Sequence, residues 1–413
     1  MNQKNTLADI VNAITRRPAL DIRSPQGNAG LLSKESVYAF NYDKQATAKD
    51  TQVALGLPFR LRSYQSGDLF SVFAMNEPEG YLRLHIEDAM SRIGIPNKLF
   101  YLLLSEGLQI GRIGFTHEQI KLEAPSTESL EGLIKERSTT YFEHLLNKHG
   151  LRSGLSGAQP KVLVPIETSL PHIWEQRATI RTPSTIVKAA GAEFPGVCLN
   201  EYFCLSVAKK AGLTVPDFWL SDDAERLVID RFDRTETQRP LGFEDMAVVF
   251  GVTAAKKYQG SYESIMRATA IYCQDAEATA TMFERIAVSC ILRDGDAHLK
   301  NFGLLYNDPS ANIAPSPAYD IVCTYIYPDL DREMALKMNK TRSFPSDASL
   351  IKFAGSFGVT RTQATESIAR IHAAIDAQFE EAENDDRYLI DSNNVLKKLK
   401  AVLRPDAGGR RGP

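Results

Sequence analysis

The stretch RDGDAHLKNF, residues 293–302, carries the most specific chemical pattern in this chain. It follows an apolar helical pattern and places Asp296 five residues before Asn301. Transfer of a phosphoryl group to a hydroxyl needs one carboxylate near the hydroxyl proton and a second polar group that holds Mg²⁺. Asp296 and Asn301 have a spacing that suits these two tasks, whereas Asp294 does not. A polar loop that caps the preceding helix explains the same residues equally well.

The sequence after this stretch adds a second carboxylate. Residues 302–306 are predicted to form a strand, and a returning strand is predicted from residue 313 onwards. This hairpin ends at PAYDI, residues 317–321, which would bring Asp320 beside Asn301. Protein kinases place a metal-binding aspartate after a short hairpin in the same way. Two oxygen ligands with phosphate and water suit octahedral Mg²⁺; the alternative for Asp320 is a carboxylate in a turn.

Three upstream segments are candidates for nucleotide contacts. Lys188 ends the apolar run TIVK and would neutralise phosphate charge, with Glu201 on the next helix as its partner; the alternative is an exposed lysine at a strand end. The run LVID at 227–230 is a candidate strand towards an adenine contact. SGLSGAQPK at 153–161 has small residues whose backbone N–H groups suit phosphate. A mobile surface turn is the alternative for this last segment.

Composition excludes several classes of protein. A hydrophobic content of 43% and a charged content of 24% are ordinary for a globular chain of 413 residues. The net charge of -3 provides no basic field for a nucleic-acid backbone. The five cysteines lack a CxxC pair, which argues against a disulfide framework or a zinc site. No signal peptide or membrane-length apolar run is recognised, so a cytoplasmic protein without a membrane partner is expected.

The texture of the sequence predicts an α+β fold in several parts. We expect a small N-terminal subdomain at 1–125, a mixed α/β nucleotide-binding lobe at 126–240 and a mainly helical lobe with the catalytic loop at 241–405. The tail at 406–413 is expected to be disordered.

Individual elements follow from local patterns. In the first part, 18–30 is a polar stretch with glycine and proline, 37–42 alternates like a strand, and helices are expected after Gly80 and at 97–106. Towards the other end, Thr360 opens a capping box for a long helix.

Six segments resemble those of HipA-like proteins, the kinase toxins of bacterial toxin–antitoxin systems. They are SGAQPK (156–161), NEYFCLSVAKKAGL (200–213), VIDRFDR (228–234), EDMAVVFG (244–251), DAHLKNF (296–302) and PAYDI (317–321). They follow the order of the family across residues 153–325, and the N-terminal region also resembles the small N-terminal subdomain of that family.

The resemblance implies a serine/threonine protein kinase with a two-lobed, protein-kinase-like fold that uses ATP and Mg²⁺. It implies Asp296 as the catalytic carboxylate, Asn301 and Asp320 as Mg²⁺ ligands, and Lys188 as the lysine on the ATP phosphates. Further nucleotide contacts implied by the resemblance are Ser156, Gly157, Ala158, Gln159, Lys161, Asp230, Arg231, Phe232, His298, Lys300 and Tyr319.

The resemblance also implies partners. Family members are counteracted by a small helix-turn-helix antitoxin (HipB-like), bind operator DNA through it, and phosphorylate aminoacyl-tRNA synthetases. Many carry an autophosphorylated serine where this chain has Gly154, which leaves Ser153 and Ser156 as candidate acceptors, Ser153 being favoured. Two alternatives stay open: a non-catalytic co-repressor on an antitoxin–DNA complex, and a small-molecule kinase.

Overall fold

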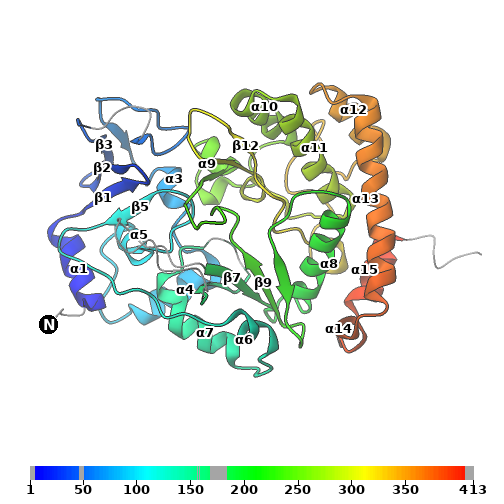
Figure 1. The fold of residues 1–413 in the computed structure, drawn as a ribbon, viewed down its shortest axis with the longest axis horizontal. Helices are drawn as coiled ribbons and strands as arrows, with labels where there is room; N and C mark the ends of the chain where they lie inside the picture. Colours follow the sequence, from blue (N-terminus) through cyan, green and yellow to red (C-terminus); the bar gives the residue numbers. More distant parts are fainter. Residues whose placement is uncertain (1–4, 46–50, 156, 158, 168–183, 405–413) are drawn as a thin grey trace, which may run out of the picture.

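The computed structural model describes residues 5–45, 51–155, 157, 159–167 and 184–404, so the tail at 406–413 lies outside it. The described part has the predicted α+β fold: three sheets, all antiparallel, are surrounded by helices (Figure 1). No helix among these residues combines the length and the apolarity needed to cross a bilayer.

A five-stranded sheet with the order β4-β3-β2-β1-β5 forms the N-terminal part (Figure 1). The strand predicted at 37–42 is confirmed as β3, but the polar stretch at 18–30 also forms strands, which corrects the prediction. Gly30 permits the close pairing of β2 with β3, because a Cβ atom there would lie 2.1 Å from the Asn41 carbonyl oxygen. The elements are α1 (Leu7–Arg16), β1 (Ala19–Ser24), β2 (Gly27–Lys34), β3 (Tyr38–Tyr42), β4 (Tyr64–Ser66), α3 (Ser71–Ala74), α4 (Gly80–Ala89), α5 (Leu99–Leu104) and β5 (Gly114–Thr116).

The second sheet has the order β6-β7-β9-β8, and its faces differ in character. Val162 and Val187 pack beneath α6 and α7, whereas Lys161 and Lys188 pair across β6 and β7 and share the opposite face. The β-branched runs predicted all three longer strands. The elements are α6 (Leu130–Lys135), α7 (Tyr141–His149), β6 (Lys161–Pro165), β7 (Ser184–Ala189), α8 (Val197–Lys210), β8 (Phe218–Leu220) and β9 (Arg226–Asp230).

The remaining part is mainly helical and contains a small sheet with the order β10-β11-β12. Thr360 and Gln363 form the predicted capping box at the start of α13. The return strand expected from residue 313 is only two residues long. The elements are β10 (Gly242–Asp245), α9 (Met246–Val249), α10 (Tyr262–Cys273), α11 (Ala276–Ile291), β11 (Gly303–Tyr306), β12 (Ala314–Pro315), α12 (Asp347–Gly355), α13 (Arg361–Ala382), α14 (Asp386–Leu389) and α15 (Val395–Leu403), with short 3₁₀ turns at Gly150–Arg152, Ala254–Lys256, Leu299–Asn301 and Thr324–Ile326.

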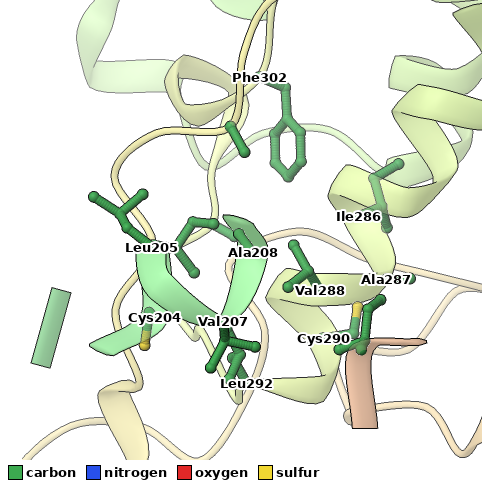
Figure 2. Close-up of a cluster of buried hydrophobic side chains, with 14 of the residues drawn as sticks. Cys204, Leu205, Val207, Ala208, Ile286, Ala287, Val288, Cys290, Leu292 and Phe302 are labelled. Carbon is green, nitrogen blue, oxygen red and sulfur yellow. The ribbon is translucent and has the colours of Figure 1, made fainter. Parts of the chain in front are cut away.

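The largest hydrophobic core joins α8 to α11 and supports the loop that follows α11. Figure 2 shows Cys204 and Val207 of α8 near Val288 and Cys290 of α11, with Phe302 above them. All of these side chains are buried. The loop with Asp296 and Asn301 thus runs between two anchored points, the end of α11 and Phe302, which fixes where its polar side chains emerge.

Candidate active site

A cavity of about 550 Å³ opens between the N-terminal part, the β6–β9 sheet and the loop at 293–302. It brings together every site residue expected for catalysis, metal or nucleotide that the structure describes. These are Gly157, Gln159, Lys161, Lys188, Asp230, Arg231, Phe232, Asp296, His298, Lys300, Asn301, Tyr319 and Asp320. Ser156 and Ala158 lie outside the described residues. The roles of the individual residues stay predictions.

Lys188 lies at the centre of this cavity between two carboxylates. Its Nζ atom is 2.6 Å from Glu201 Oε1 on α8 and 2.6 Å from Asp320 Oδ1. Lys188 is 4% exposed and Glu201 is completely buried. Burial alone would lower the pKa of Lys188, but the charges of Asp320 and Glu201 outweigh it and hold this pKa above its ordinary value. The lysine is therefore a fixed positive charge, in contact with the partner expected from the sequence.

Asp320 lies beside Asn301, where the hairpin argument puts it. Its Oδ2 atom accepts a hydrogen bond from Asn301 Nδ2 at 2.9 Å, and its backbone has a left-handed φ of 56°. Burial alone would raise the pKa of Asp320, but Lys188 and Lys161 outweigh it and keep this pKa well below its ordinary value. Carboxylate and amide oxygens are ligand types that Mg²⁺ takes together with phosphate and water. The Asn301 amide oxygen accepts a hydrogen bond from the His298 backbone N–H at 3.0 Å, which leaves one of its two lone pairs for a metal.

Positive charge and close backbone approach are combined at the β6 end of the cavity. Lys161 is directly opposite Lys188 in the strand register, so two ammonium groups face the same space. Burial lowers the pKa of Lys161, with Asp320 acting against this effect. Gly157 has a φ of 116°, and a Cβ atom there would lie 2.6 Å from Lys161 Nζ. The positive φ favours glycine at this position, because the end of the lysine side chain could move away from a Cβ atom but the backbone conformation would stay strained.

Ser153, the favoured candidate acceptor, is buried. It is 1% exposed, and its Oγ atom accepts a hydrogen bond from the Leu163 backbone N–H at 2.9 Å and donates to the His149 carbonyl at 3.1 Å. This burial argues against Ser153 as an acceptor in this conformation, and the choice between Ser153 and Ser156 stays a prediction because Ser156 lies outside the described residues. Gly154 is also constrained, because a Cβ atom there would lie 2.5 Å from the Asn76 carbonyl oxygen. A serine at 154 would require this loop to move.

Part of the cavity lining is aromatic. The Phe232 ring lies 5.2 Å from that of Tyr319 and 5.1 Å from that of Phe243, centroid to centroid. Beside them, burial and the nearby charge of Asp217 raise the pKa of Asp230 to about 6. Aromatic rings and ammonium groups that line one cavity suit the base and the phosphates of a nucleotide.

The N-terminal part closes the cavity through polar contacts that the sequence did not indicate. The Arg231 guanidinium donates to the Leu108 carbonyl at 2.9 Å and pairs with Asp233 at 2.7 Å. Lys300 pairs with Glu79 at 2.7 Å. Both side chains therefore hold the N-terminal part against the site, in addition to lining the cavity.

The loop at 293–302 contains two aspartates, Asp294 and Asp296, whose surroundings differ. Asp294 is buried, and its Oδ1 atom accepts a hydrogen bond from the Asp296 backbone N–H at 3.1 Å. Burial, followed by the charge of Asp296, raises the pKa of Asp294 well above its ordinary value. Asp296 emerges into the cleft, while burial and the charge of Lys257 lower the pKa of neighbouring His298 to about 3. Asp294 thus stabilises the loop, and Asp296 is the carboxylate available to a reactant.

Sequence comparison agrees with this geometry. The profile of the HipA-like C-terminal domain matches residues 153–379, more than half of the chain, and the profile of the HipA N-terminal domain matches residues 20–115. The chain belongs to the HipA family. The first match contains every described residue of the cavity that was predicted from the sequence, and the second covers most of the five-stranded sheet.

Individual HipA relatives match over part of their length. Two proteins of Sinorhizobium fredii, each described as "Putative kinase", are 30% identical over 281 residues and 31% identical over 211 residues. These matches cover 64% and 48% of this chain and the same shares of the two relatives, so the chain spans less than two thirds of either. A Haemophilus influenzae protein of the same description is 26% identical over 258 residues, 56% of this chain and 74% of that protein.

A solved HipA structure supports the fold assignment. HipA of Shewanella oneidensis, in a complex with HipB and its operator DNA, superimposes with a TM-score of 0.66 over 93% of this chain and 97% of that chain. The two sequences are 18% identical, so the likeness concerns the fold. The two-lobed, kinase-like α+β architecture predicted from the sequence is therefore confirmed.

Proposed function

We propose that this HipA-family chain is an ATP- and Mg²⁺-dependent serine/threonine protein kinase. The observation that carries the proposal is the junction of Lys188, Glu201, Asp320 and Asn301 inside one cavity, with Asp296 at its mouth. A structural ion pair alone would not need two further polar residues and an open space beside it.

Each residue has a distinct task in this proposal. Lys188 and Lys161 neutralise nucleotide phosphates, and Glu201 fixes the direction of Lys188. Asp320 and Asn301 would hold Mg²⁺, which supplies charge neutralisation on the transferred phosphoryl group when it is bound. Asp296 orients the acceptor hydroxyl and takes its proton as the hydroxyl oxygen bonds to the γ-phosphorus of ATP, while the bond from this phosphorus to the β,γ-bridging oxygen breaks and ADP leaves.

The proposal extends to the biological role. We propose a toxin that a small HipB-like helix-turn-helix antitoxin counteracts, that reaches operator DNA through this antitoxin, and that phosphorylates a translation component such as an aminoacyl-tRNA synthetase. Support for the antitoxin and the DNA comes from the Shewanella oneidensis relative, which was solved with both. The parts at 1–125, 126–240 and 241–405 are proposed as its structural divisions.

The test is phosphate transfer by the full chain. Purified protein is incubated with Mg²⁺ and ATP labelled at the γ-phosphate, together with a bacterial extract, and labelled proteins are hydrolysed for phosphoamino-acid analysis. We expect phosphoserine or phosphothreonine with the wild type and with Asp88→Asn, an exposed carboxylate on α4, but not with Asp296→Asn. Label confined to small molecules would favour the small-molecule kinase instead. In a second experiment, the chain and its Asp296→Asn variant are expressed in bacteria. Growth arrest that persists with the variant would point to toxicity by binding.

A further inference from the structure

The segment between α9 and α10 and the first residue of α10 are each bonded to the catalytic loop. The Lys257 carbonyl accepts a hydrogen bond from the Leu299 backbone N–H at 3.1 Å. The Tyr262 hydroxyl donates to the Ala297 carbonyl at 3.1 Å. The backbone N–H of Tyr262 donates to the Lys337 carbonyl at 2.9 Å, outside the loop. The backbone on both sides of Tyr258 is therefore fixed relative to residues 293–302.

Tyr258 itself reaches the proposed catalytic carboxylate. Its hydroxyl donates to Asp296 Oδ1 at 2.8 Å. Its ring stands edge-on to the His298 ring, with 5.2 Å between the centroids, and the side chain is 49% exposed. Asp296 Oδ2 accepts no hydrogen bond from any group in the described part of the chain. One oxygen of this cavity-lining carboxylate is thus occupied by Tyr258, while the other is not occupied by any group in the described part of the chain.

We propose that Tyr258 is a positioning residue that holds Asp296 through Oδ1, so that Oδ2 is directed at the acceptor hydroxyl; this rests on the proposed kinase function. The terminal torsion of an aspartate is broad when nothing holds it. A hydrogen bond to a charged oxygen is stronger than a neutral one and restricts this rotation. Proton acceptance in the transition state depends on such alignment.

A different role for the same contact is that of a gate, in which the phenol takes the place of the acceptor. The contacts of Tyr258 favour positioning. Its ring packs on His298, and the flanking Lys257 is bonded to the loop, so Tyr258 is tied to the loop that contains Asp296. It occupies Oδ1 alone and leaves the second oxygen to a reactant.

Steady-state kinetics of the full chain test the proposal. Tyr258→Phe keeps the ring on His298 and removes the hydroxyl, so we expect kcat to fall about tenfold, the loss of about 1.4 kcal/mol of transition-state stabilisation, with the KM for ATP and the nucleotide affinity unchanged. Tyr81→Phe is the matched control, because Tyr81 is 44% exposed on α4, and it should behave like the wild type. Tyr258→Leu also lacks the hydroxyl and replaces Tyr258→Phe if that variant does not fold.

A double-mutant cycle separates positioning from a general structural effect. If Tyr258 acts through Asp296, removal of its hydroxyl should have no further effect on the residual rate of Asp296→Asn. A kcat of Tyr258→Phe equal to or above that of the wild type would overturn the positioning role, and an increase would establish the gate. If Tyr258→Phe lowered the rate by the same factor in the wild type and in Asp296→Asn, the positioning role would also be overturned. An inactive wild type with intact nucleotide binding would instead refute the kinase function.

Discussion

Replacement of Glu201 tests how Lys188 is held. Glu201 is completely buried and lies 2.6 Å from Lys188, while Asp320, the second partner at 2.6 Å, has a side chain that is 34% exposed. Loss of one partner from a buried ion pair costs about 3–5 kcal/mol of unfolding free energy. Because Asp320 still compensates Lys188, we expect Glu201→Ala to lie at the lower end, about 3 kcal/mol. Glu201→Gln keeps the shape and an acceptor oxygen, and should cost about 1 kcal/mol.

Urea unfolding of the purified chain measures both losses. Glu366→Ala and Glu366→Gln are the matched controls, because Glu366 is exposed on α13 and forms no ion pair among the described residues. Both controls should stay within about 0.5 kcal/mol of the wild type. Nucleotide binding, followed by calorimetry, should weaken more in Glu201→Ala than in Glu201→Gln, since the glutamine keeps a second acceptor for Lys188 beside Asp320.

Two results would refute this reasoning. A loss in Glu201→Ala no greater than in Glu366→Ala would mean that Asp320 alone satisfies Lys188. If Glu201→Gln lost as much unfolding free energy as Glu201→Ala, the charge of Glu201, and not the presence of a packed acceptor oxygen, would determine the loss of stability.

The remaining predictions concern metal, catalysis, modification and pH. Asp320→Ala should weaken Mg²⁺·ATP binding at least about tenfold in calorimetry; unchanged affinity in a folded variant would remove Asp320 from the site. Asp296→Asn should lower kcat by about 10²–10⁴ while nucleotide affinity is kept, because a general base acts on the acceptor hydroxyl; a parallel loss of affinity would contradict this division. Peptide mass spectrometry after incubation with Mg²⁺·ATP should find Ser153 unmodified, since its buried hydroxyl is hydrogen-bonded. Burial raises the pKa of Glu244 to about 7, so the folded state retains a proton that the unfolded state releases near its ordinary pKa of 4.5. Glu244 should therefore contribute a fall of about 3 kcal/mol in the unfolding free energy as the pH rises from 4.5 through 7, and the difference between the wild type and Glu244→Gln in urea titrations at several pH values should show this contribution.

Local patterns were sufficient where the chemistry of an element is contained in its own sequence. The runs that became β6, β7 and β9 are rich in valine and isoleucine, because both faces of these strands are covered. Thr360 indicated the start of α13 because its capping partner, Gln363, is only three residues further along the sequence. The strands β1 and β2 were missed because their polar and glycine residues are stabilised by pairing, which a short window of sequence does not contain.

In the site, too, contacts between residues near in sequence could be predicted, whereas contacts between distant segments could not. The approach of Asp320 to Asn301 follows from a short hairpin, and that of Glu201 to Lys188 from a strand followed by a helix, so spacing was a sufficient guide. Tyr258 reaches Asp296 across 38 positions, and no pattern around it indicates this contact. The burial of Ser153 likewise depends on Leu163 in a neighbouring strand.

The ion pair between Glu79 and Lys300 has an evolutionary consequence. It joins residues 221 positions apart, and Asp233 adds a second link when it accepts a hydrogen bond from the Gly111 backbone N–H at 2.6 Å. A recombination event that exchanged the first 125 residues between two divergent genes of this kind would keep the backbone link to Asp233 but break the ion pair wherever the incoming segment lacks a carboxylate at position 79. The two halves of the gene should therefore be inherited as one unit, with substitutions at position 79 accepted mainly when position 300 changes as well.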